Sequence, residues 1–124
     1  MALPLSNLAT WLTDQDVPGV GIDWMPDSPD EVVVVSNAGG LPPTLDGAVE
    51  CQHVQIRCRA GIDPDAEALA LQVHRLITGL TGSFTMGSTR IVTAEAVTGP
   101  PAFFGRDADQ RFGYAAVYAF TTPT

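Results

Sequence analysis

The segment CQHVQIRCRAGIDPDAEALALQVHRLITGLTG, residues 51–82, decides the fold, because it joins the clearest strand of the chain to its clearest helix. In its first part, Val54, Ile56 and Cys58 alternate with polar and charged residues, which is typical of a strand with one buried face. The residues expected on the outer face of this strand are His53, Gln55, Arg57 and Arg59.

The second part of the same segment predicts a long amphipathic helix. Asp63 is placed to cap its amino terminus, and Pro64 suits the first helical position. Asp65 and Glu67 complement the positive end of the helix, and Gly82 is expected to end it. The apolar side chains recur at helical spacing and form one stripe, made of Ala66, Leu69, Ala70, Val73, Leu76, Ile77 and Leu80.

The remaining elements follow from the patterns on either side. The four valines of residues 31–37 (EVVVVSN) do not alternate with polar residues, so we expect a short strand buried on both faces. The other expected elements are a helix over 3–15, a short strand within 20–25, a loop over 38–47, a strand over 89–99, a loop or hairpin arm over 100–110 and a last strand over 111–122.

Length and element order together predict the architecture. A chain of 124 residues is near the commonest size of one domain, so we expect a single domain over residues 1–124. Two helices among four or five strands predict an α+β fold, in which a mostly antiparallel sheet carries both helices on one face.

The charge balance excludes several classes of function. The chain has fourteen carboxylates against six arginines and no lysine, which gives a net charge of −8. Binders of nucleic acid or of anionic membranes need a cationic surface, so neither is expected. No segment approaches the ~20 apolar residues of a membrane span, and the first cationic side chain is Arg57, so no signal peptide is expected.

The search for chemistry leads to no catalytic, cofactor or metal site. Cys51 and His53 share one face of their strand while Cys58 lies on the other, and His74 lies on the helix, which does not suit a zinc site. The two cysteines are too far apart along a strand for a disulfide. No nucleophile elbow or phosphate loop is present in the sequence, so we do not expect an enzyme.

The carboxy-terminal stretch FFGRDADQRFGYAAVYAF, residues 103–120, is apolar on both faces of its expected strand. The chain has little left to cover the second face, so another subunit is the simplest cover. The charged part, residues 105–111, is either a polar hairpin turn or a contact between subunits. The second interpretation makes Phe103, Phe104, Gly105, Arg106, Asp107, Asp109, Arg111, Val117 and Tyr118 the candidate interface.

At these residues the sequence resembles a known family. PPAFFGRDADQRFGYAAVYAFTT, residues 100–122, is similar to the carboxy-terminal hairpin of the tail terminator, or minor capsid (tail-completion), proteins of long-tailed bacteriophages. The amino-terminal helix, VQIRCRAG (54–61) and DPDAEALALQVHRLITGL (63–80) occur in the same order as the elements of that family.

The resemblance implies a structural virion protein of the tail and neck, made in the bacterial cytoplasm. It implies a ring, typically a hexamer, that caps the head-proximal end of the tail tube, ends its growth and joins it to the neck. The implied partners are further copies, the tube protein and a neck or connector protein, and DNA would pass through the lumen without specific binding. The alternatives are a head-side connector or stopper, or a small cytosolic α+β enzyme or ligand-binding domain.

Overall fold

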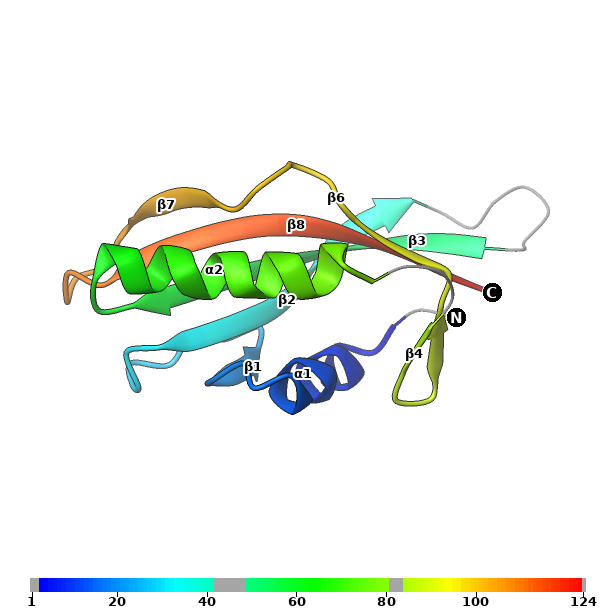
Figure 1. Cartoon of the computed structure of the whole chain (residues 1–124), viewed down its shortest axis with the longest axis horizontal. Helices are drawn as coiled ribbons and strands as arrows, with labels where there is room; N and C mark the ends of the chain where they lie inside the picture. Colours follow the sequence, from blue (N-terminus) through cyan, green and yellow to red (C-terminus); the bar gives the residue numbers. More distant parts are fainter. Residues whose placement is uncertain (1–2, 42–48, 81–83, 124) are drawn as a thin grey trace.

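The computed structural model describes residues 3–41, 49–80 and 84–123 (Figure 1). Within these ranges the chain forms helix α1 (Leu5–Asp14) and helix α2 (Asp63–Thr78). The strands are β1 (Val20–Ile22), β2 (Val32–Leu41), β3 (Val49–Ala60), β4 (Phe84–Met86), β5 (Thr89–Ile91), β6 (Thr93–Ala96), β7 (Ala102–Arg106) and β8 (Phe112–Pro123). The α+β fold is confirmed, although the expected four to five strands are too few.

Six of these strands make one sheet, and β4 pairs with β5 in a separate hairpin. The order runs β1-β2-β3-β8, and both β6 and β7 pair with β8 beyond it. Only the β1–β2 pair is parallel, and the other described pairs are antiparallel. Strand β6 lies beside residues 118–121 of β8 and β7 beside residues 112–115, so together they form one interrupted edge.

Both helices pack on the same face of this sheet, as the sequence predicted. Helix α2 lies along β3 and β8, and α1 lies against β1 and β2 (Figure 1). The side chains between the two layers form one core, which includes Leu8 and Leu12 of α1, Val73 and Ile77 of α2, Val54 and Ile56 of β3, and Tyr118 and Phe120 of β8.

The ends of α2 differ from the sequence prediction. Asp63 is the first helical residue and not the cap, because Ile62 occupies the cap position and no side chain caps the helix. The carboxylate of Asp63 instead accepts a hydrogen bond of 2.7 Å from the hydroxyl of Tyr114, which holds the helix start to β8. At the other end the helix stops at Thr78, and Gly82 lies outside the described residues.

Two strands differ in length from the sequence prediction. Strand β2 continues to Leu41, through residues whose composition indicated a loop, and residues 42–47 of that loop lie outside the described residues. A register shift between Asn37 and Gly40 accommodates Gly39 and Gly40, which both have a positive φ. The strand expected over 89–99 is divided into β5 and β6. The burial of Val32–Val35 on both faces of β2 is confirmed.

Candidate functional site

The two faces of β8 have different surroundings. Toward the helices, Tyr114, Ala116, Tyr118 and Phe120 are buried and belong to the core. On the opposite side no helix covers the strand among the described elements, and its side chains are only half-buried. We call this second surface the open face, and it consists of Ala115, Val117 and Ala119 of β8 with His53 and Gln55 of the neighbouring β3.

One end of that side is closed by the connection between β1 and β2. Arg59 of β3 donates to the carbonyl oxygens of Pro29 (2.7 Å from Nη2) and Asp30 (3.2 Å from Nε), so residues 23–31 lie over the sheet. Val32 and Val34, which face away from the helical core, are buried there. Arg59 lies on the outer face of β3, as expected, but it is only 5% exposed because this connection covers it.

The charged residues of the β7–β8 turn are bound mainly to one another. Asp107 accepts hydrogen bonds from the Arg111 backbone N–H (2.9 Å) and from its guanidinium Nε (2.8 Å). Nη2 of Arg111 donates to Asp109 at 3.2 Å, and Nη1 donates to the carbonyl oxygen of Asp27. The Arg111 backbone N–H is the main reason that the pKa of Asp107 is lowered. These three charges therefore hold the hairpin and the 23–31 connection together.

The aromatic part of the hairpin is exposed. Phe103 is 51% exposed and contacts the rings of Phe112 and Tyr114, with centroids 6.2 and 5.7 Å apart. Phe104 is 55% exposed and its ring lies over Gly113, on the side of the open face. The two phenylalanines thus lie on opposite sides of the sheet edge.

Three further candidate residues of the hairpin and of β8 lie in different environments. Gly105 has a φ of 135° at the register shift between β7 and β8, a conformation that favours glycine. The Arg106 guanidinium lies 4.9 Å from the centre of the Phe112 ring. Tyr118 lies in the core, 1% exposed, with its hydroxyl 2.9 Å from Nδ1 of His74. Of Val117 and Tyr118, only Val117 is accessible to a neighbour.

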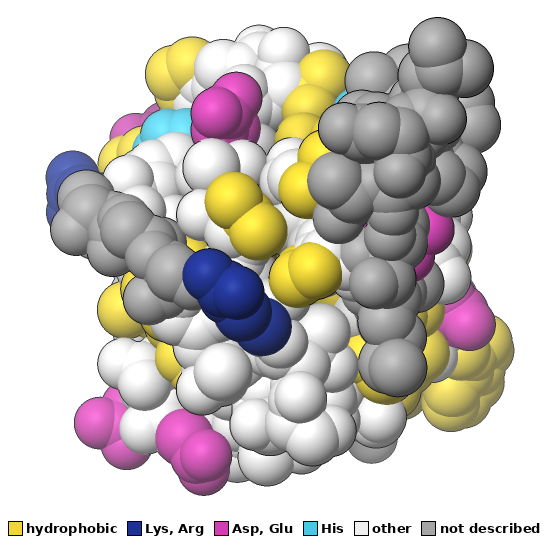
Figure 2. Space-filling view, turned by 90° about the vertical axis from the view of Figure 1, so that its right-hand side faces the viewer, with side chains coloured by type: hydrophobic (Ala, Val, Ile, Leu, Met, Phe, Trp, Pro, Cys, Tyr) yellow, Lys and Arg dark blue, Asp and Glu magenta, His cyan; other side chains and the backbone are white. Residues whose placement is uncertain are grey.

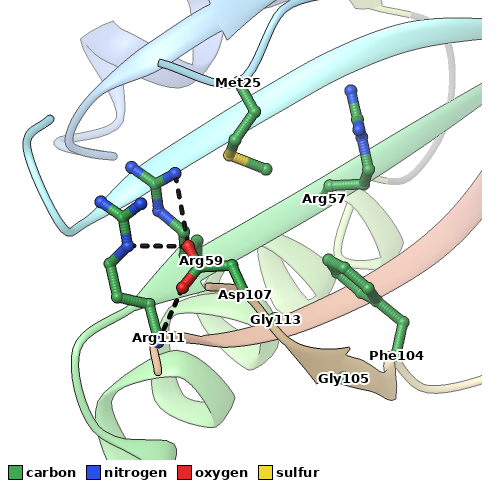
Figure 3. Close-up of a pocket in the computed structure, with 8 residues that line it drawn as sticks. All are labelled: Met25, Arg57, Arg59, Phe104, Gly105, Asp107, Arg111 and Gly113. Atoms are coloured by element: carbon green, nitrogen blue, oxygen red, sulfur yellow. Dashed lines mark hydrogen bonds and ion pairs between the residues drawn. The ribbon is translucent and has the colours of Figure 1, made fainter. Parts of the chain in front are cut away.

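A small cavity of about 140 Å³ lies where the hairpin, β3 and the 23–31 connection meet (Figure 3). Its lining residues are Met25, Arg57, Arg59, Phe104, Gly105, Asp107, Arg111 and Gly113. Figure 3 shows Arg57 standing apart from the Arg59–Asp107–Arg111 cluster. The sequence pattern placed Arg57 on an outer face but did not indicate a pocket, because the pocket needs segments that are far apart in the chain.

No metal centre is found among residues 3–41, 49–80 and 84–123, where no three histidine, cysteine or acidic side chains are grouped to hold an ion. Cys51 and Cys58 are free thiols, and burial raises the pKa of Cys58 to about 12, which keeps it protonated. No helix in the described part of the chain is long and apolar enough to cross a membrane.

Figure 2 shows the end of the molecule that lies at the right of Figure 1. On the visible part of this surface, acidic side chains lie mainly near the margins, and hydrophobic and basic side chains lie between them.

An exposed aromatic hairpin beside a half-covered sheet face is typical of a subunit that assembles with other proteins. Comparison with known families identifies the kind of protein, because a model of the bacteriophage tail terminator protein matches residues 6–123. The chain therefore belongs to the bacteriophage tail terminator family, whose members are structural proteins of the virion tail, and the family resemblance found in the sequence is confirmed. A search of curated proteins found no match.

Proposed function

We propose that this chain forms a closed ring, typically of six copies, that caps the head-proximal end of the phage tail tube. The ring ends tube growth and joins the tail to a neck or connector protein. The observation that supports this role most directly is the open face, which no described helix covers. A role in assembly, without catalysis, accounts for that face and for the exposed hairpin.

Head-to-tail contacts between copies explain why such a face exists. In a heterologous interface one patch of a subunit meets a different patch of its neighbour, and a ring results when the rotation closes. Val117 and the flanking alanines offer a flat surface of small side chains, and Phe103 and Phe104 supply large apolar area beside it. Arg106, Asp109 and Gly105 complete the proposed interface at the hairpin, whereas Asp107 and Arg111 support it from within the chain.

The charge of the chain suits passage of DNA through the ring. A wall carrying carboxylates repels phosphates, so DNA would pass the lumen without being held. This proposal requires that the lumen carries carboxylates and not the six arginines. A ring structure with arginines along the lumen and carboxylates only at its rim would contradict it.

Tube length and oligomeric state test the main proposal. The purified protein, alone or with the tube protein, is expected to give a particle of about six copies by light scattering. Tube protein polymerised with it is expected to give tubes of limited length, each with a ring at one end in electron microscopy. Tubes that grow equally long with and without the protein would overturn the proposal.

A further inference from the structure

The cavity at the border of the open face contains three arginines, and two of them are already neutralised. Arg111 lies 2.8 Å from Asp107, 3.2 Å from Asp109 and 3.5 Å from Asp30. Arg59 forms an ion pair with Asp107 at 4.0 Å and donates hydrogen bonds to the backbone carbonyls of Pro29 and Asp30. These two guanidinium groups are therefore committed to holding the chain together.

Arg57 has no such partner. Its Nη2 donates one hydrogen bond of 3.2 Å, to the carbonyl oxygen of Asp23, and within the described residues no carboxylate pairs with it. Its Nε is buried without an acceptor. A guanidinium has five N–H donors, and a buried donor without an acceptor costs free energy. Arg57 is therefore the cation of this region that is available to an added acceptor.

The surface next to Arg57 is apolar. Phe104 and the half-buried Met25 line the cavity with it, and Gly113 forms part of the wall beneath the Phe104 ring. Arg57 is paired in register with Ala115, so the open face begins directly beside it. The cavity thus combines an unpaired cation with apolar walls and opens beside a surface of small side chains.

We propose that this cavity, the Arg57 pocket, receives an apolar side chain and an adjoining carboxylate from a second copy of the chain. The carboxylate accepts hydrogen bonds from the terminal nitrogens of the Arg57 guanidinium, and the apolar side chain lies against Phe104 and Met25. This inference rests on the proposed ring and adds the charge pair that sets its register.

Charge complementarity favours a second copy as the occupant. Each copy carries fourteen carboxylates against six arginines, so two copies repel each other at a distance. A stable contact between them needs a cation that meets a carboxylate of the neighbour. Arg57 lies beside the open face, whereas Arg75 lies on the exposed surface of α2 and Arg106 lies against Phe112.

Removal of the charge tests the pair. Arg57→Gln keeps a hydrogen-bond donor but loses the cation, and Arg75→Gln makes the same change of net charge away from the pocket. Under the conditions in which the natural protein assembles, Arg57→Gln is expected to weaken association between copies by at least about tenfold. Arg75→Gln is expected to associate normally. Equal association of both variants, each folded by circular dichroism, would overturn the proposal.

A cross-linking experiment identifies the occupant without disturbing Arg57. A benzophenone amino acid replaces Phe104, and the assembled protein is irradiated with the tube protein present. Covalent dimers of the chain, with the attachment mapped next to an aspartate or glutamate, support the pocket. Cross-links to the tube protein alone, or none, would exclude a second copy as the occupant. If normal rings still terminate tubes in that case, the proposed function stands and only the pocket is excluded.

Discussion

The two faces of β8 differ in burial and in the size of their side chains. Toward the helices it presents large side chains, of which Tyr118 and Phe120 are 1% and 0% exposed. Toward the open face it presents only glycine, alanine, valine and threonine, which are mostly half-buried. The apolar character is shared, but the size of the side chains is not. Large side chains fill a core within one chain, and small ones leave a flat surface on which another chain can lie.

The largest expected effect comes from a charge on the helix-covered face. Tyr118→Asp places a carboxylate in the core and removes the hydrogen bond to His74. We expect it to lower the free energy of unfolding by about 4 kcal/mol or more, enough to unfold a marginally stable domain. Far-ultraviolet circular dichroism against urea measures this. A variant that folds with nearly natural stability would show that this face is not the core.

A smaller effect is expected where the hairpin meets the open face. In Gly113→Ala the new methyl group would collide with the Phe104 ring, which must then move off the strand. Because Phe104 is a surface side chain, we expect a loss of only about 1 kcal/mol in the free energy of unfolding. Urea unfolding measures it, with Ala115→Gly on the same face as the matched control. A loss as large as that of Tyr118→Asp would show that the hairpin is part of the core.

Acid is expected to weaken the β7–β8 turn, because Asp107 binds Arg111 there as a carboxylate. The pKa of Asp107 is lowered in the folded protein, so its contribution to stability is present above the ordinary aspartate value of 3.8 and is lost as pH falls through the lowered value. Asp107→Asn is therefore expected to be less stable than the natural protein at about pH 7 but to lose less stability on transfer to about pH 3. Urea unfolding at both pH values checks this, and equal losses would contradict it.

The smallest effect on stability is expected on the open face itself. Val117→Asp places its carboxylate on a half-exposed surface, so we expect the free energy of unfolding to change by no more than about 0.5 kcal/mol. Assembly, in contrast, is expected to fail, because the charge would be buried against the neighbouring copy. Light scattering and urea unfolding of the same sample measure both. Normal assembly of this variant would show that the neighbour does not use the open face.

The elements could be predicted wherever local periodicity was strong. The residues that make the alternation of β3 are close together in the sequence, and so are those that make the apolar stripe of α2. Both elements form as expected. The features that local periodicity missed have a common physical cause. Asp63 was expected to cap α2, but a distant tyrosine hydroxyl binds it. Arg59 lies on the outer face of its strand as expected, but carbonyl groups about thirty positions earlier in the chain cover it, which the local pattern did not indicate.

Part of the candidate site could be predicted because its residues are close together in the sequence. The hairpin residues from Phe103 to Arg111 adjoin one another in sequence, so their gathering could be predicted. The local pattern left open whether Asp107 and Arg111 bind each other within the chain or a neighbouring subunit, and the structure shows that they bind each other. The local pattern did not indicate that Arg57 remains unpaired beside them, because this depends on how the 23–31 connection crosses the sheet.

The edges of the sheet bear on aggregation. Strand β1 has three residues and covers only part of β2, and the opposite edge is divided between β6, with four, and β7, with five and a register shift. An interrupted edge offers few free backbone groups in a row, so further strands cannot easily add to it. Growth into open-ended fibrils is thereby discouraged at the margin formed by β6 and β7. Under the proposed role in ending tube growth, such an edge also keeps the chain from starting a polymer of its own.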